Sequence, residues 1–363
     1  MARNSRLHVR YEENLRVFAS GATRVAVTAV IVVAVLLPYQ VTDDWLQTLS
    51  FCGCFAIGAI GLNLLTGFTG QVSLGHAFFL AVGGYVAAHI GLHSALPVPV
   101  WLLLVAIIGA AVGAVIGPFA LRLHGNYLAI VTIALLFVSD YIWTRWHWFT
   151  GGGVGLQPNP TIRIGPVNFA KLGSIGLHSR AQGVYLLIWI VVAACAVLAK
   201  NLVRTRAGRA MQAIRDRDLA AEAIGVSLTR YKVGAFAVSS AMAALAGALY
   251  FGVLLRSIEP GQVTGSLGLV LSIQFVAAII IGGVGTVHGS IVGALFVAGL
   301  PELVRRFGTS LPFIGKGKVL SVSAFSNLLF GVLVVGFLLV EPLGFAALWR
   351  RVKAYFLTWP FSY

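Results

Sequence analysis

Four polar residues stand close together in an otherwise apolar part of the sequence: Asn63, Gln71, Ser73 and His76. Their amide, hydroxyl and imidazole groups can exchange hydrogen bonds with a polar solute. Three glycines between residues 67 and 75 interrupt the helical pattern there, and each lowers helix stability by about 1 kcal/mol. A glycine-interrupted apolar segment is typical of a transport pathway. We therefore expect these four side chains to line or flank a translocation path.

Two other interpretations of this segment stay open. Residues 67–76 could form an ordinary short loop between two membrane spans, with the polar side chains capping the nearby backbone. His76 could instead be a metal ligand or a catalytic base, but it has no His, Cys or acidic partner at local spacing. The sequence shows no paired carboxylates and no nucleophile with an adjacent base, so we expect neither a catalytic nor a metal site.

The second segment of interest is the long charged stretch 200–232. Asp218 suits a helix N-cap, Gly225 suits the position after a helix, and Ser227 could cap the next one. The pattern predicts a short helix at 208–215 and another of about six residues at 219–224. Helices this short are marginal in water. They must pack either on the chain's own membrane-proximal surface or in a groove on a cytoplasmic partner.

For a docked loop, the sequence suggests which side chains face the partner. Small or apolar residues would form the buried contact, with a charged rim around them, and Gly208 and Gly225 mark the two ends. The apolar set is Ala213, Ile214, Ala220, Ala221 and Ile224, and the rim is Arg209, Arg215, Asp216 and Glu222.

The elements that position these residues follow from composition. Of 363 residues, 58% are hydrophobic and 10% are charged, against about 25% charged in soluble proteins. This excludes a soluble enzyme, a soluble binding module and a disordered chain. We predict an all-α polytopic membrane protein of about ten transmembrane helices, with the glycine-interrupted segment after the second. The expected spans are 25–39, 45–66, 77–93, 100–121, 127–144, 184–199, 233–255, 269–281, 290–304 and 325–339.

The net charge of +15 bears on orientation. With ten spans, 17 of the 26 lysines and arginines fall on the side that holds both termini and the 200–232 loop, and nine fall on the other. Cytoplasmic loops carry the excess of positive charge. The sequence thus predicts a basic cytoplasmic tail at 1–24, a permease domain at 25–345 and a cytoplasmic tail at 346–363, with 145–181 outside. Aromatic residues follow the apolar runs rather than the basic ones, so no nucleic-acid partner is expected.

Residues 219–225, preceded by 208–216, resemble the EAA-type coupling loop of ABC importer permeases, although Leu219 stands where many of them have Glu. Three further stretches match the branched-chain amino acid form of these permeases, and together the likeness covers most of 45–345. They are residues 61–78, 150–156 and 282–289. The chain resembles the LivM-like permease subunits of high-affinity branched-chain amino acid ABC importers.

The resemblance implies partners in a bacterial plasma membrane. These are a second, related permease, two cytoplasmic ATPases docked on 208–225, and an extracytoplasmic substrate-binding protein. The sequence has no G-x-x-x-x-G-K-[ST] phosphate loop, so ATP is expected on the partner ATPases and no cofactor on this chain. Siblings of the family import urea, short amides or simple sugars, which keeps the substrate open.

A stand-alone channel or a secondary transporter is the competing class. It would need no docking loop and would usually carry ionisable residues in mid-span.

Overall fold

A computed structural model describes residues 21–121, 127–164, 167–169, 178–263, 265–308, 322–340 and 344–358. The expected N-terminal tail therefore lies outside the described residues, apart from its last four. The described chain is almost entirely helical, and its one sheet is a two-stranded antiparallel ribbon in which Ile164 pairs with Val167. The predicted all-α class is confirmed.

The helices follow the predicted spans in order, and most extend a few residues beyond them. The first part of the chain forms α2 (Gly21–Leu36), η1 (Leu37–Tyr39), α3 (Asp43–Thr69), α4 (His76–His93), α5 (Val98–Leu121), α6 (Tyr127–Arg145), α7 (His147–Thr150) and η2 (Gly152–Val154). The middle part forms β1 (Arg163–Ile164), β2 (Val167–Asn168), α8 (Arg180–Arg204), α9 (Arg206–Asp216), α10 (Asp218–Ala223), α11 (Leu228–Gly247) and the π-helical η4 (Ala248–Leu255). The last part forms α12 (Pro260–Val263), α13 (Gly265–Gly282), α14 (Val287–Gly308), α15 (Val322–Val340) and α16 (Phe345–Thr358).

Six of these helices are long and apolar enough to cross a membrane. Shorter apolar helices add Val27–Tyr39, Gly268–Gly282 and Leu328–Phe337. The outer helices turn large apolar side chains outward, among them Leu103 on α5, Ile130 on α6 and Leu339 on α15. Soluble monomers rarely expose large contiguous apolar surfaces. The arrangement is that of a polytopic membrane protein, while the count of ten spans stays a prediction.

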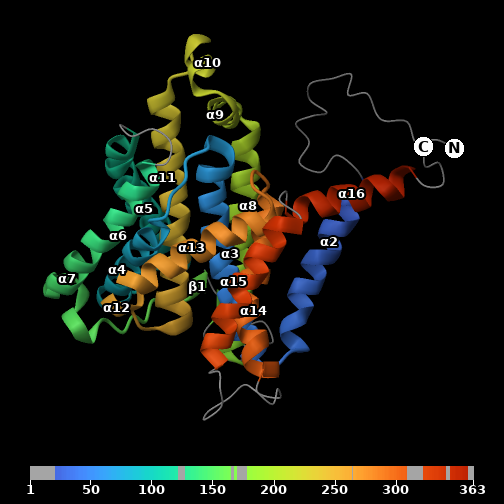
Figure 1. The fold of residues 1–363 in the computed structure, drawn as a ribbon. Coiled ribbons are helices and arrows are strands. Elements are labelled where there is room, and N and C mark those ends of the chain that lie inside the picture. The colour runs from blue at the N-terminus through green and yellow to red at the C-terminus, as the bar shows by residue number, and fades with distance from the viewer. Residues whose placement is uncertain are drawn as a thin grey trace.

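Helix α3 forms the centre of the molecule (Figure 1). It lies against α8, α11, α13 and α14, and most of its length is buried. Small residues allow this, because helices in a membrane approach closely where side chains are small. At Gly61, for example, an added Cβ would lie 2.7 Å from Met242 Cβ on α11.

The predicted interruption after the second span is confirmed. Helix α3 ends at Thr69, and Gly70 takes the left-handed conformation with φ +71°, which costs glycine little. The chain then runs non-helically to Gly75, and α4 begins at His76. Gly67 stays inside the helix, so the break starts three residues later than the sequence suggested.

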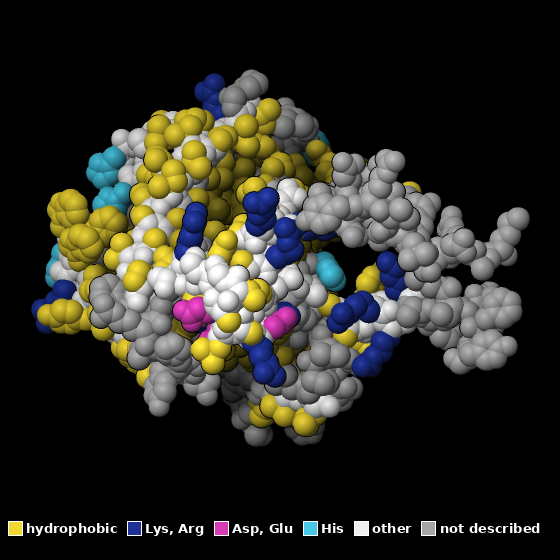
Figure 2. Space-filling model, turned by 90° about the horizontal axis from the view of Figure 1, so that it is seen from above, with side chains coloured by type: hydrophobic (Ala, Val, Ile, Leu, Met, Phe, Trp, Pro, Cys, Tyr) yellow, Lys and Arg dark blue, Asp and Glu magenta, His cyan; other side chains and the backbone are white. Residues whose placement is uncertain are grey.

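The two short helices α9 and α10 extend beyond the bundle at the end where α3 terminates (Figure 1). Viewed toward this end, lysine, arginine and acidic side chains surround the projecting loop (Figure 2). The expected C-terminal tail contains a further helix, α16, which projects sideways from the bundle (Figure 1). Its pattern was not distinguished from a tail in the sequence because it is too short and too charged to count as a span.

Candidate functional site

Helix α9 is fixed to the body of the protein along one face. Its first turn is capped by Thr205, whose hydroxyl accepts from Gly208 N–H at 3.4 Å. Met211 and Ile214 are buried, and the helix lies against α3, α8 and α11. Of the two interpretations of this short helix, packing on the chain's own surface therefore holds for α9.

Helix α10 is much more exposed. Leu219 and Ile224 are 78% and 77% exposed, and between them only Ala221 is buried. Asp218 is the first residue of the helix rather than its N-cap, which is Arg217. Large apolar side chains this exposed, at a projecting end rich in charge, are suited to contact with another protein.

This corrects the expected contact face of the loop. Ile214 and Ala221 are occupied by the chain's own helices, because they lie on the inner sides of α9 and α10. Ala213 is half-buried, while Ala220 and Ile224 are exposed. Leu219, which the sequence singled out only as a departure from the usual motif, belongs to the exposed apolar face.

Gly225 ends α10 with φ +90°, as its position in the sequence predicted. A Cβ added there would meet nothing within 4 Å. The constraint at Gly225 is therefore backbone conformation, since side chains with a Cβ rarely adopt this φ. The space around Gly225 is open on the outer side of the loop.

Among the expected rim residues, Arg215 alone reaches inward. Its Nη1 donates to the carbonyl oxygen of Gly67 near the end of α3 at 2.9 Å. Its Nε and Nη2 both donate to Asp216 Oδ1, at 3.1 and 3.0 Å. Arg209 donates to the carbonyl of Arg204 at 3.1 Å, and Glu222 is exposed. Arg215 thus joins the α9–α10 loop to the central helix.

Asn63 continues this connection into a second glycine-rich turn, at 282–286 between α13 and α14. Asn63 Nδ2 donates to Thr286 O at 2.9 Å and to Ser290 Oγ at 2.7 Å, and Asn63 Oδ1 accepts from Gly285 N–H at 2.9 Å. Two of these bonds hold α3 to the turn, and the bond to Ser290 holds it to the first turn of α14. The arrangement gives Asn63 a clamping role between helices.

The other three expected path residues are enclosed in this structure. The ring of His76 donates from Nε2 to the carbonyl oxygen of Gly58 at 2.9 Å and meets the Phe275 ring edge-on, and Ser73 is buried. Gln71 is 6% exposed, and neither atom of its side-chain amide has a hydrogen-bond partner among the described residues. Gln71 is therefore a buried amide whose hydrogen-bonding capacity the described residues leave unused.

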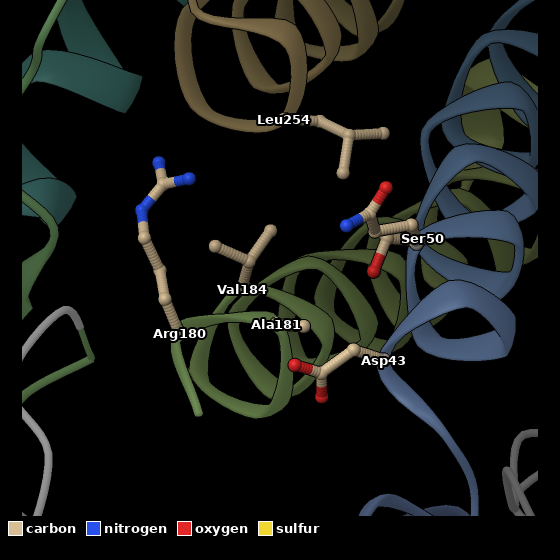
Figure 3. Close-up of a pocket in the computed structure, with 7 residues that line it drawn as sticks. Asp43, Ser50, Arg180, Ala181, Val184 and Leu254 are labelled. Atoms are coloured by element: carbon tan, nitrogen blue, oxygen red, sulfur yellow. The ribbon is translucent and has the colours of Figure 1, made fainter. Parts of the chain in front are cut away.

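Two cavities lie along a different part of α3, near its beginning. The larger, about 240 Å³, is lined by Asp43, Gln47, Ser50, Arg180, Val184 and Leu254. In Figure 3 Arg180 and Asp43 lie on opposite sides of it, with Val184 between them and Leu254 at the upper edge. The smaller, about 20 Å³, lies further along α3. It is lined by aromatic residues that include Phe51 and Phe55 of α3 and Tyr250 of η4.

Sequence reasoning missed this site. Asp43 and Arg180 both fall in loops between the predicted spans, and they are far apart in the chain. The available signal was the spacing 43, 47, 50 and 54 in α3, which places these residues on one face of a helix.

A bundle of apolar helices, a broken central helix and a projecting two-helix loop define a polytopic permease. The family model described as branched-chain amino acid transport system, permease component, matches residues 45–338. The chain belongs to this family of ABC transporter permeases.

Individual relatives agree with that assignment. The high-affinity branched-chain amino acid transport system permease protein LivM of Salmonella typhimurium is 29% identical over 294 residues, covering 77% of this chain and 68% of that protein. LivM of Escherichia coli is 28% identical over the same shares. The ribose import permease protein RbsC of Haemophilus influenzae is 26% identical over 290 residues, 78% of this chain and 85% of that protein. No solved structure matches this chain significantly.

Proposed function

We propose that this chain is a transmembrane subunit of an ABC importer that carries branched-chain amino acids (Leu, Ile and Val) across the bacterial plasma membrane. The observation that carries the proposal is the pairing of a family match over residues 45–338 with a projecting loop whose apolar side chains Leu219 and Ile224 are exposed. LivM relatives support the substrate. Binding of ATP and its hydrolysis fall to partner subunits.

In the proposed assembly, two cytoplasmic ATPases dock on the α9–α10 loop. A second, related permease completes the membrane part, and an extracytoplasmic binding protein delivers the substrate. Docked ATPases would move α10 and, through α9, Arg215. Because Arg215 binds the carbonyl oxygen of Gly67 and Asn63 binds the 282–286 turn, movement of the loop would shift both glycine-rich breaks together.

The test is reconstituted transport. The complete transporter in proteoliposomes, with ATP at the ATPase side, should accumulate radiolabelled leucine, and excess isoleucine or valine should compete. Vesicles without ATP are the control. Accumulation of leucine that ignores ATP would point instead to a channel or secondary transporter and would contradict the proposal.

A second candidate substrate class is a simple sugar, favoured by the similarity to the ribose permease RbsC. The same proteoliposomes distinguish a sugar substrate from an amino acid substrate. ATP-driven uptake of ribose, with leucine neither carried nor competing, would establish the sugar function in place of the amino acid function.

A further inference from the structure

The cavity at the beginning of α3 lies at the end of the molecule away from the α9–α10 loop. Asp43, Gln47 and Ser50 come from the first turns of α3, whereas Arg215 on α9 contacts Gly67 near the last turn. Arg180 and Val184 come from the beginning of α8, and Leu254 from the end of the π-helical segment η4. The cavity is therefore placed where a substrate arriving from the side opposite the ATPases would first meet the bundle.

The cavity holds one acid and one base, and neither charge is neutralised by its fixed partner. Asp43 Oδ1 accepts from the Ser179 hydroxyl at 2.7 Å, and Arg180 Nη2 donates to the carbonyl oxygen of Val253 at 2.9 Å. Both partners are uncharged, so they orient the side chains without cancelling their charges. Neither residue belongs to the ion pairs that the described residues form. The cavity thus presents separated positive and negative groups.

The rest of the wall is divided by chemistry. Gln47 and Ser50 continue the polar side along α3, whereas Val184 and Leu254 are apolar. The volume of about 240 Å³ is below the roughly 300–1,000 Å³ of pockets for drug-sized ligands. A small metabolite with two opposite charges and an apolar body fits this lining. A neutral sugar would leave both charges without a counterpart, which is costly once water is displaced.

Further along α3 from the cavity, toward the α9–α10 end, the same face of the helix carries aromatic side chains. Phe51 and Tyr250 lie 5.1 Å apart between ring centroids, and Phe55 stacks on Phe275 at 4.0 Å. The cavity remaining among these rings is only about 20 Å³, so the aromatic side chains block passage of a solute at this point along α3. Tyr250 belongs to η4, and π-helical segments are frequently found at functional sites.

We propose that this cavity is the site where the permease itself receives its substrate, a zwitterionic α-amino acid with an aliphatic side chain. Arg180 binds the carboxylate, Asp43 binds the ammonium group, and the aliphatic side chain faces Val184 and Leu254. The rings of Phe51 and Tyr250 form the constriction that must open next. The assignment of substrate rests on the proposed function, but the charge recognition does not.

The direct test is protection of a cysteine placed in the cavity. Gln47→Cys in the assembled transporter, without binding protein, is modified by a membrane-impermeant methanethiosulfonate. The chain's own three cysteines are buried. Millimolar leucine should slow modification severalfold. Isoamylamine, 4-methylpentanoate and ribose, which lack one or both charges, should slow it far less.

Charge variants then identify the groups. Asp43→Asn and Arg180→Gln should each weaken protection by leucine about tenfold, the loss expected for one charge-assisted hydrogen bond. Asp44→Asn and Arg145→Gln are matched controls outside the cavity and should leave protection unchanged. Full protection in both cavity variants, or equal protection by ribose, would overturn the site.

The substrate site in the cavity and the import function can be contradicted independently. Leucine uptake in proteoliposomes without leucine protection at residue 47 would overturn this site and leave the import function standing. Leucine protection lost in Asp43→Asn, together with no ATP-driven leucine uptake by the unmodified transporter, would support the site and overturn the import function.

Discussion

Arg215 is the residue through which the α9–α10 loop touches the central helix. Its hydrogen bond to the carbonyl oxygen of Gly67 is partly exposed, because the side chain keeps 41% of its surface. Such a bond contributes about 1–2 kcal/mol, a factor of roughly 5–30. We expect Arg215→Gln to lower leucine uptake by about this factor while the ATPases still bind. Uptake per ATP hydrolysed is the measurement.

The control for Arg215 is Arg350→Gln on α16, an exposed arginine outside the loop. It should leave uptake per ATP unchanged. An equal loss in both variants would mean that positive charge, rather than the contact with Gly67, matters.

Gln71 allows the path and loop interpretations of the glycine-interrupted segment to be separated. Its buried amide lacks a partner among the described residues, and such a group costs about 1–3 kcal/mol. We expect Gln71→Met to raise the thermal unfolding temperature in detergent and to lower uptake, because the amide would be kept for a passing solute. Higher stability with unchanged uptake would establish the plain-loop interpretation.

Gln182 is the matched control for Gln71. It is also buried, but its amide accepts from His178 and Ser179 N–H and donates to Pro38 O at 3.0 Å. Gln182→Met should lower the unfolding temperature, because it leaves those groups unpaired.

At the residue scale, the sequence predicted features that depend on nearby residues, but it did not reveal contacts between residues far apart in the chain. The φ of Gly225 follows from its own position after a short helix. Asn63 looked like a path residue because it is polar among apolar neighbours, but its partner Ser290 lies 227 positions away. Asp43 and Arg180, which meet in one cavity, are also far apart in the chain. No spacing rule within one helix could reveal this arrangement.

At the scale of elements, substitutions in α10 can distinguish a loss of ATPase docking from a loss of stability. Leu219→Ser with Ile224→Ser removes two exposed apolar side chains, each worth about 1.5–3 kcal/mol when buried by a partner. We expect ATPase subunits to bind at least about tenfold more weakly, with the unfolding temperature unchanged. Co-purification and thermal unfolding measure the two quantities.

Two further variants complete that experiment. Val352→Ser removes an exposed apolar side chain of α16 and should not alter ATPase binding. Ala221→Glu places a charge at a buried position and should lower stability as well as binding. Tight ATPase binding by the Leu219 and Ile224 double variant would exclude α10 as the docking element.

The elements themselves were largely predictable. Each of the ten expected apolar segments coincides with a helix, because apolar length alone marks a span. Most of the helices extend past these segments, because the polar residues at their ends carry no hydropathy signal. At α8 a capping box at Ser179 marks the true start. The π-helical end of α11 was missed because it does not change the pattern of apolar residues, and α16 was missed because it is too short and too charged to count as a span.

For the whole molecule, orientation is the property on which both proposals depend. The charge distribution predicts that both termini and the α9–α10 loop lie in the cytoplasm, and the cavity at Asp43 would then face outside. Single-cysteine labelling with an impermeant maleimide tests this. Val154→Cys, at an 87% exposed position in the predicted outer loop, should react in intact cells. Cysteines at Gln212, Ala223 or Lys353 should react only after permeabilisation.

The same labelling determines which end of α3 faces the outside and which faces the ATPases. If Val154→Cys reacts from outside and Ala223→Cys from inside, α3 runs from a charged cavity on the outer side to the Arg215 contact on the ATPase side. Substrate recognition and ATPase docking would then lie at opposite ends of one helix. Reaction of Gln212→Cys from outside would reverse the molecule. It would put the exposed Leu219 and Ile224 out of reach of any cytoplasmic ATPase.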